Sequence, residues 1–173
     1  MEWEHTVGDF VTYKQNGICK ICSTVKRDFA GMGEREYFEL RPVYDEKTDL
    51  FIPKDSQSLT GTMRHILTKD EINKIIDESQ TKEVEWIKDA KERAKAFEAV
   101  IEEGDRKRIL SIIKVLSLHK AELDGRQKKM YASDSRILAL AERIIDEEFA
   151  FVLDIDRACV REYIMKRLEK ERT

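Results

Sequence analysis

The sequence predicts an α+β fold, in which a small SH3- or Tudor-like antiparallel β-barrel is followed by an all-α helical domain. Two observations lead to this prediction. Segments rich in β-branched and aromatic residues all lie before about residue 55. After that point Leu, Ile, Ala, Lys and Glu recur at helical spacing. We therefore expect a β domain over residues 1–56 and a helical domain over 62–173, joined by a short linker rich in Ser, Thr and Gly.

The amino-terminal part contains short stretches with strand character, separated by turn residues. Gln15-Asn16-Gly17 is typical of the turn between two such stretches, because Gly adopts the positive φ that tight hairpins need. Pro53 closes the last stretch, since it cannot donate to a ladder. The expected strands cover residues 7–13, 18–25, 35–41 and 50–53.

The helices after residue 61 are expected from their end signals. Thr68-Lys69-Asp70-Glu71 has the capping-box pattern. Thr81 is expected to start a long helix that ends at Gly104, a residue suited to the left-handed C-terminal position. The expected N-caps are, in chain order, Thr68, Thr81, Asp105, Ser133 and either Asp154 or Asp156.

The charge of the chain is unevenly distributed. The 173 residues carry a net charge of −3, and 39% of them are charged. Residues 86–129 hold 12 Lys/Arg against 8 Asp/Glu, a local +4, whereas residues 1–85 carry −5 and residues 130–173 carry −2. The middle region is the one with a basic excess, which favours contact with phosphate. An ordinary charged helix surface explains the same numbers.

Cysteine usage and the absence of catalytic motifs argue against an enzyme. Cys19, Cys22 and Cys159 form an odd, small set, which is typical of a reducing compartment and not of a disulfide framework. A structural zinc site needs four ligands, and Cys19-Lys20-Ile21-Cys22 has no second pair. The sequence contains neither His-Glu-x-x-His nor Gly-x-Ser-x-Gly, nor a phosphate-binding Gly-rich loop. We expect a binding protein without catalytic residues, metal or cofactor.

The chain also lacks the patterns that direct a protein to a membrane. Its first residues are acidic and do not form the apolar segment of a signal peptide. The apolar run at residues 149–153 is too short to span a bilayer. We expect a cytoplasmic protein with no membrane partner and no small-molecule substrate.

Trp86 is the single residue whose position raises a functional question. On the expected long helix it shares a face with Arg93 and Phe97, while the aliphatic stripe centres on Ile87 and Ala94. Trp86 is thus expected at the edge of the apolar face, beside basic residues. Two interpretations stay open: an aromatic residue at the edge of the core, or one that meets a partner or nucleic-acid bases.

Several segments, in order, resemble the CarD-type (CdnL) bacterial transcription regulators. The amino-terminal module of that family is shared with the RNA-polymerase-interacting domain of transcription-repair coupling factor. The similarity covers roughly residues 4–155. It rests on the order and spacing of the matching segments more than on any single motif. The matching segments are Val7-Gly8-Asp9-Phe10-Val11-Thr12-Tyr13 with Gly17, Glu36-Tyr37-Phe38-Glu39-Leu40, Phe51-Ile52-Pro53, Gly61 with Arg64, Trp86, Gly104-Asp105, Arg136-Ile137-Leu138 and Glu147-Glu148-Phe149-Ala150.

The resemblance implies a regulator that binds the β lobe of the RNA polymerase β subunit by adding its sheet edge to it. It further implies that the helical domain contacts promoter DNA at the upstream fork, largely without sequence specificity, and that a helix-borne Trp stabilises the open complex. The implied polymerase-binding residues are Arg27, Asp28, Phe29, Phe51 and Pro53. The implied DNA-binding residues are Trp86, Lys88, Lys91, Arg93 and Arg136.

The sequence departs from the family pattern at three places. The turn Tyr13-Lys14-Gln15-Asn16-Gly17 lacks the Pro and His that many members carry. Phe51 occupies a position where some members have Arg, which implies an apolar contact instead of an ionic one. Trp86 lies further from Gly104 than in some relatives. Two other functions remain open: a polymerase- or protein-binding adaptor or repressor that does not touch DNA, and a small enzyme with an unfamiliar site.

Overall fold

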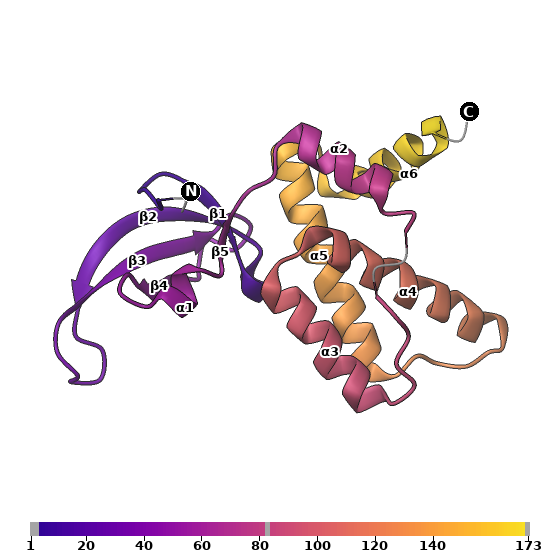
Figure 1. The fold of residues 1–173 in the computed structure, drawn as a ribbon, viewed down its shortest axis with the longest axis horizontal. Helices are drawn as coiled ribbons and strands as arrows, with labels where there is room; N and C mark the ends of the chain where they lie inside the picture. Colours follow the sequence, from indigo (N-terminus) through magenta and orange to yellow (C-terminus); the bar gives the residue numbers. More distant parts are fainter. Residues whose placement is uncertain (1–3, 82–83, 172–173) are drawn as a thin grey trace. The chain divides into compact units, whose positions relative to one another are not determined.

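The computed structural model describes residues 4–81 and 84–171 and divides the chain into two compact units, Met1–Ile66 and Leu67–Thr173. The first unit is built on an antiparallel sheet and the second on helices (Figure 1). This arrangement confirms the predicted α+β class. The boundary lies after residue 66, because a further strand continues the β unit beyond the expected linker.

The sheet has the strand order β4-β3-β2-β1-β5 and is antiparallel throughout. Consecutive strands from β1 to β4 are neighbours, as in a meander, and the last strand returns to pair with the first. Among the described residues, β4 and β5 are the two edges of the sheet. The strands are β1 (Phe10–Tyr13), β2 (Ile18–Arg27), β3 (Arg35–Pro42), β4 (Leu50–Pro53) and β5 (Met63–His65).

The first four strands match the four expected from the sequence, and β5 corrects the expectation that strand structure ends near residue 55. The chain reaches β5 through a single turn of helix, α1 (Gln57–Thr60). Gly61 follows it closely, and a Cβ there would lie 2.8 Å from the carbonyl oxygen of Gln57. Met63 then enters the core opposite Tyr13. The strand is only three residues long, too short for an alternation pattern to reveal it.

The core of the β unit also accounts for the Cys-x-x-Cys segment. Cys19 is fully buried in this core, whereas Cys22 lies at an irregularity of the β2–β3 pairing and is half-buried. All three cysteines are free thiols. The buried core consists of Val11, Tyr13, Cys19, Ile21, Phe38, Leu40, Ile52 and Met63.

In the second unit, the long helix α5 lies at the centre and packs against α3, α4 and α6 (Figure 1). Its inward face includes Ile137, Ala141 and Phe149, all fully buried. Within the described part of the chain, none of the helices is long and apolar enough to cross a membrane. The helices are α2 (Lys69–Glu78), α3 (Ala90–Glu103), α4 (Arg106–Gly125), α5 (Ala132–Leu153) and α6 (Val160–Glu171), the last preceded by the 3₁₀ turn η2 (Arg157–Cys159).

Three of the expected helix ends are confirmed. Thr68 and Glu71 form a reciprocal capping box at the start of α2. Gly104 ends α3 in the left-handed region with a φ of 72°. Asp105 caps α4 by accepting a hydrogen bond from the backbone N–H of Arg108. Each is a local signal, and each was readable because the bond lies within one turn of the cap.

Two expected helix starts are wrong. α3 begins at Ala90 and not near Thr81, because Asp89 is its N-cap and accepts from the N–H of Glu92. The competing pattern Asp89-x-x-Glu92 was present in the sequence and signals this start. α5 begins at Ala132, so that Ser133 lies inside the helix and does not cap it.

At the other end of α5, the two aspartates that were alternatives have different roles. Asp154 ends the helix in the left-handed region. Asp156 accepts a hydrogen bond from the N–H of Ala158 and caps η2, which leads into α6.

Candidate functional site

Three aromatic side chains meet beside the β4 edge of the sheet, and we call them the edge cluster: Phe29, Tyr37 and Phe51. The ring of Phe29 packs edge-on against Tyr37, with centroids 5.0 Å apart, and lies 5.3 Å from the ring of Phe51. Tyr37 is buried on β3 and Phe51 is half-buried on β4, whereas Phe29 is exposed in the loop after β2. The cluster thus presents an aromatic surface supported from within the unit.

The backbone of β4 borders this cluster. β4 pairs with β3 on one side, with Phe51 opposite Glu39 and Pro53 opposite Tyr37. No other strand of the described sheet pairs with its second side. An edge of this kind offers N–H and C=O groups to an added strand, although Pro53 has no N–H to donate. The β4 edge and the edge cluster therefore form one continuous candidate surface.

Charged residues frame that surface where β2 and β3 meet their connecting loop. Arg27 is exposed and lies opposite Arg35 in the strand register. Arg35 forms a bidentate ion pair with Asp55, at 3.1 and 2.6 Å, and this hydrogen bonding lowers the pKa of the Asp55 carboxyl below its ordinary value. Asp28 accepts a hydrogen bond from the N–H of Gly33 and so closes the hairpin loop.

The structure brings all five predicted polymerase-binding residues to this part of the β unit. Arg27, Asp28 and Phe29 follow one another at the end of β2, and the Phe29–Phe51 contact joins them to β4. Tyr37 was not predicted from the sequence as part of this surface. Its position opposite Pro53 and its contact with Phe29 place it there. Met32, an exposed apolar residue in the loop between β2 and β3, was not predicted either.

In the helical unit, Trp86 lies in the non-helical segment before α3, which corrects the expectation of a helix-borne Trp. Its ring is half-buried and packs against the helical core. The imidazole of His119 lies 4.3 Å from the ring centroid, and the guanidinium of Arg93 lies 4.1 Å from it. Trp86 also borders a cavity of about 450 Å³ against α4. Its surroundings are those of an aromatic residue at the edge of the core.

Arg93 is not available to phosphate in this structure, contrary to its predicted role. Its side chain is 1% exposed and forms a bidentate ion pair, at 2.9 and 2.5 Å, with Asp134, which is 0% exposed. Its Nη1 donates to the carbonyl oxygens of Ile87 and Lys88, at 2.6 and 3.1 Å. A buried guanidinium with this many partners has a structural role. If Arg93 moved away, the carboxylate of Asp134 would remain buried without its counter-charge.

The other predicted cations are exposed. Lys88 and Lys91 lie at the start of α3, and Arg136 lies in the second turn of α5, where it pairs with Glu98 of α3. The Arg93–Asp134 pair joins the first turns of α3 and α5, so the amino-terminal ends of these helices lie together (Figure 1). Helix amino termini carry partial positive charge, which adds to that of the lysines.

The sequence analysis missed a short basic segment that leads into α5. Lys128, Lys129 and Tyr131 are exposed and precede Ala132 directly. Two adjacent lysines at the end of the region with a basic excess, with an aromatic residue two positions further on, were the available signal. These residues enlarge the cationic end of the helical unit, which we define as Lys88, Lys91, Lys128, Lys129 and Arg136.

Buried carboxylates elsewhere in the unit are tied to arginines and have structural roles. Glu148 accepts two hydrogen bonds from Arg106, each 2.9 Å, and one from the backbone N–H of Leu67. Burial raises the pKa of Glu147 above its ordinary value, although Arg143 and Arg157 attract its charged form. Over residues 4–81 and 84–171, no group of three His, Cys, Asp or Glu side chains is placed to hold a metal ion.

Comparison with known proteins identifies the β unit. Residues 5–67 match the family model described as the CarD-like/TRCF RID domain, and this span coincides with the first unit of the structure. No curated protein matches the chain. RID domains of this family interact with the β subunit of RNA polymerase. The amino-terminal unit is thus a CarD-like/TRCF RID domain, the type of domain that interacts with RNA polymerase in this family.

Proposed function

We propose that the protein is a non-enzymatic regulator of transcription initiation that binds the β lobe of RNA polymerase and stabilises the promoter open complex. The β unit holds the polymerase, and the helical unit contacts DNA at the upstream fork. The observation that supports this most strongly is the RID match over residues 5–67, together with an unpaired β4 edge beside the exposed ring of Phe29.

On the polymerase side, the proposed mode is addition of a strand to β4. Backbone hydrogen bonds along an edge give affinity, and side chains beside it give specificity. Phe29 and Phe51 are the proposed anchors, because the exposed ring of Phe29 is already held against Tyr37 and Phe51 and therefore loses little conformational entropy on binding. Arg27 and Asp28 lie at the rim, where charge steers association. Pro53 limits the register of the added strand by leaving one donor out.

On the DNA side, the proposed contacts are those of the cationic end with phosphates. Contacts of this type position a protein without reading bases, so we expect little sequence specificity. A protein already bound to polymerase needs only weak affinity for DNA, because tethering raises the effective concentration. A DNA role is therefore compatible with a net charge of −3.

Trp86 is proposed as the residue that meets the unpaired bases at the fork. Its ring contacts His119 and Arg93 in the free protein, so insertion exchanges these contacts for stacking on a base. The exchange replaces one aromatic contact by another, and DNA already melted nearby lowers the unstacking energy. A core-edge role is the alternative, and its signature would be a loss of helix content on removal of the ring.

The first experiment measures binding of the full-length protein to the isolated β lobe of its host polymerase. Arg27→Glu should weaken binding at least tenfold. Lys47→Glu is the matched control, since it makes the same charge change at an exposed position of the β3–β4 connection, and it should stay within twofold of wild type. Equal binding by both variants would exclude the Arg27 surface. No binding by folded wild type would remove the polymerase proposal for this chain.

The second experiment tests the DNA side through the lifetime of open complexes. Trp86→Ala should shorten that lifetime while circular dichroism keeps its helical signal. Lys88→Glu combined with Lys91→Glu should shorten it while binding to the β lobe stays unchanged.

A second candidate function is an adaptor or repressor that binds polymerase without touching DNA. Its support is the ion pairing of Arg93 and Arg136, which removes two of the predicted cations from ready contact with phosphate. The double lysine variant discriminates the two functions: unchanged transcription with intact polymerase binding favours the adaptor.

A further inference from the structure

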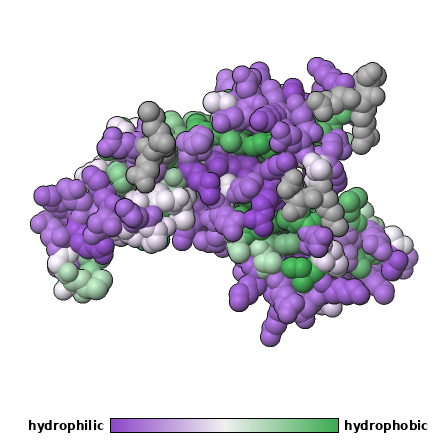
Figure 2. Space-filling view, viewed as in Figure 1, coloured by the Kyte–Doolittle hydropathy of each residue, from purple (hydrophilic) through white to green (hydrophobic). Residues whose placement is uncertain are grey.

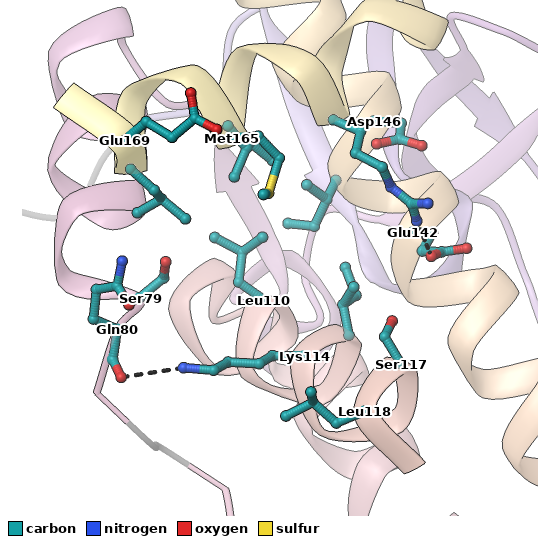
Figure 3. A pocket seen from close by; sticks show the side chains of 15 residues that line it. Ser79, Gln80, Leu110, Lys114, Ser117, Leu118, Glu142, Asp146, Met165 and Glu169 are labelled. Atoms are coloured by element: carbon teal, nitrogen blue, oxygen red, sulfur yellow. Dashed lines mark hydrogen bonds and ion pairs between the residues drawn. The ribbon is translucent and has the colours of Figure 1, made fainter. Parts of the chain in front are cut away.

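The helical unit has an apolar groove that neither proposed contact uses. It runs between α4 on one side and α5 and α6 on the other, with a volume of about 640 Å³ (Figure 3). Ser79 and Gln80, after α2, close one end. We call it the α4–α6 groove. The aliphatic side chains that line it are Leu110, Ile113, Ile145, Ile164 and Leu168.

The two lips of the groove carry large apolar side chains that face solvent. Leu118 on α4 is 64% exposed, and Met165 on α6 is 53% exposed. Hydrophobic surface over α4 is visible among hydrophilic neighbours in Figure 2. A small ligand on the floor would leave both lips in water, whereas a helix laid along the groove would cover both. Methionine adapts to irregular partner surfaces because its side chain is unbranched and flexible.

The charged residues around the groove favour a partner with positive charge. Three carboxylates line it, Glu142, Asp146 and Glu169, against two cations, Lys114 and Arg161. Arg161 donates to Glu142 at 2.6 Å, and Lys114 donates to the backbone oxygen of Gln80 at 3.2 Å. The cations are thus engaged within the groove itself, and the balance of the lining is acidic.

Asp146 stands out on the α5 wall. Its carboxyl is half-buried and faces the groove. Burial and the nearby Glu142 and Glu147 raise its pKa, more than Arg161 and Arg157 lower it. A Lys or Arg supplied by a partner would therefore gain an ion pair at a position where the protein itself leaves the negative charge under-compensated.

From these observations we infer that the α4–α6 groove binds an amphipathic α-helix of another protein, with aliphatic anchors on one face and a Lys or Arg beside them opposite Asp146. A second copy of this chain is a poorer occupant, because a two-fold interface would bring the same carboxylates toward each other. The inference does not depend on the polymerase or DNA contacts, since none of the residues proposed for those contacts lines the groove.

The test uses two designed peptides of about 18 residues, each roughly 27 Å long as a helix. Both carry Leu at positions i, i+3, i+4 and i+7. One has Lys beside these anchors, and its twin has Glu at the same positions. Each carries a fluorescent label, and anisotropy reports its binding to the full-length protein. The protein variants are Leu118→Gln with Met165→Gln, Asp146→Asn, and Tyr131→Gln as the control, which alters an exposed apolar residue of the same unit outside the groove.

We expect the Lys peptide to bind at least tenfold more tightly than its Glu twin. The double lip variant should weaken the Lys peptide at least tenfold and Asp146→Asn at least threefold, with Tyr131→Gln within twofold of wild type. Circular dichroism checks that every variant is folded.

Four results would overturn the inference. They are no binding of the Lys peptide, equal binding of the two peptides, binding that the groove variants do not change, and self-association of the wild type that the lip variant abolishes. The last result would assign the groove to a second copy.

Discussion

The edge cluster of the β unit and the Trp86 site of the helical unit differ in how their aromatic residues are held. Phe29 reaches solvent, and its ring packs against the rings of Tyr37 and Phe51. Trp86 lies against Arg93, which is itself fixed by Asp134 and two backbone carbonyl oxygens. The first site is therefore accessible in the free protein. The second is coupled to a buried ion pair, so its use by a partner changes the contacts of the scaffold.

The same contrast appears in the charges. The ion pairs of the β unit, such as Arg35–Asp55 and Arg41–Asp49, lie at the surface. The helical unit buries two bidentate pairs, Arg93–Asp134 and Arg106–Glu148. Exposed pairs contribute little to stability, but breaking a buried pair leaves an uncompensated charge inside the protein. Loss of one carboxylate should therefore have very different effects in the two settings.

The largest expected effect comes from Asp134→Ala, which leaves Arg93 buried without its partner. We expect the free energy of unfolding of the helical unit to fall by about 3–5 kcal/mol. Urea unfolding followed by circular dichroism measures it. Glu98→Ala is the matched control, because it removes the partner of an exposed arginine, Arg136, between the same two helices; it should change stability by about 0–1 kcal/mol. A small effect of Asp134→Ala would mean that Arg93 finds water instead, and that Trp86 is less firmly held than its contacts indicate.

The next largest effect is expected at the edge cluster. Phe51→Ala removes a ring that Phe29 rests on, and we expect affinity for the β lobe to fall about tenfold, or about 1.4 kcal/mol. Tyr44→Ala, an exposed aromatic of the same unit outside the cluster, should leave affinity within about twofold. Titration calorimetry with the purified β lobe compares them. Equal losses in both variants would contradict a specific role of the cluster.

A smaller effect is expected for single lysines of the cationic end. Lys91→Ala should weaken DNA retention in the polymerase complex and reduce the slope of log affinity against log salt by about one. The control is Lys69→Ala, an exposed lysine of α2 outside the cationic end. Filter-binding of open complexes at several salt concentrations gives both slopes. If Lys91→Ala leaves the salt-dependence slope unchanged, Lys91 does not contact a phosphate.

These comparisons also show which parts of the structure the sequence could reveal. Local signals were sufficient for the four longer strands and for the ends marked by Thr68, Gly104 and Asp105. The start of α3 was misplaced because a tertiary bond holds the segment before it: the N–H of Val84 donates to the hydroxyl of Ser111, 27 positions away. No helical wheel contains such tertiary bonds. A capping pattern at Asp89 was the only local sign.

The candidate sites divide in the same way. Phe29 and Phe51 could be selected through resemblance, but their contact is visible only in the structure, where the loop after β2 reaches past β3 to β4. The burial of Arg93 could not be foreseen, because its partner Asp134 lies 41 positions away in another helix. An arginine near a tryptophan has the same sequence pattern whether it faces DNA or a buried carboxylate. Only the packing of α3 against α5 distinguishes the two.

The smallest expected effect sharpens the contrast between buried and exposed carboxyls through pH. Burial raises the pKa of Glu147, so the folded protein holds this proton more tightly than the unfolded chain does. Its contribution to stability is present below the ordinary carboxyl pKa of about 4.5 and is lost as pH rises through the higher folded value. Wild type should therefore lose stability relative to Glu147→Gln between about pH 4 and about pH 7. Glu162, exposed and hydrogen-bonded to Lys166, has a lowered pKa, so Glu162→Gln should give a weaker trend of the opposite sign. Urea unfolding of wild type and both variants at the two pH values measures these trends. If both variants changed stability with pH in the same direction, the arginine partners and not burial would determine the pKa of Glu147.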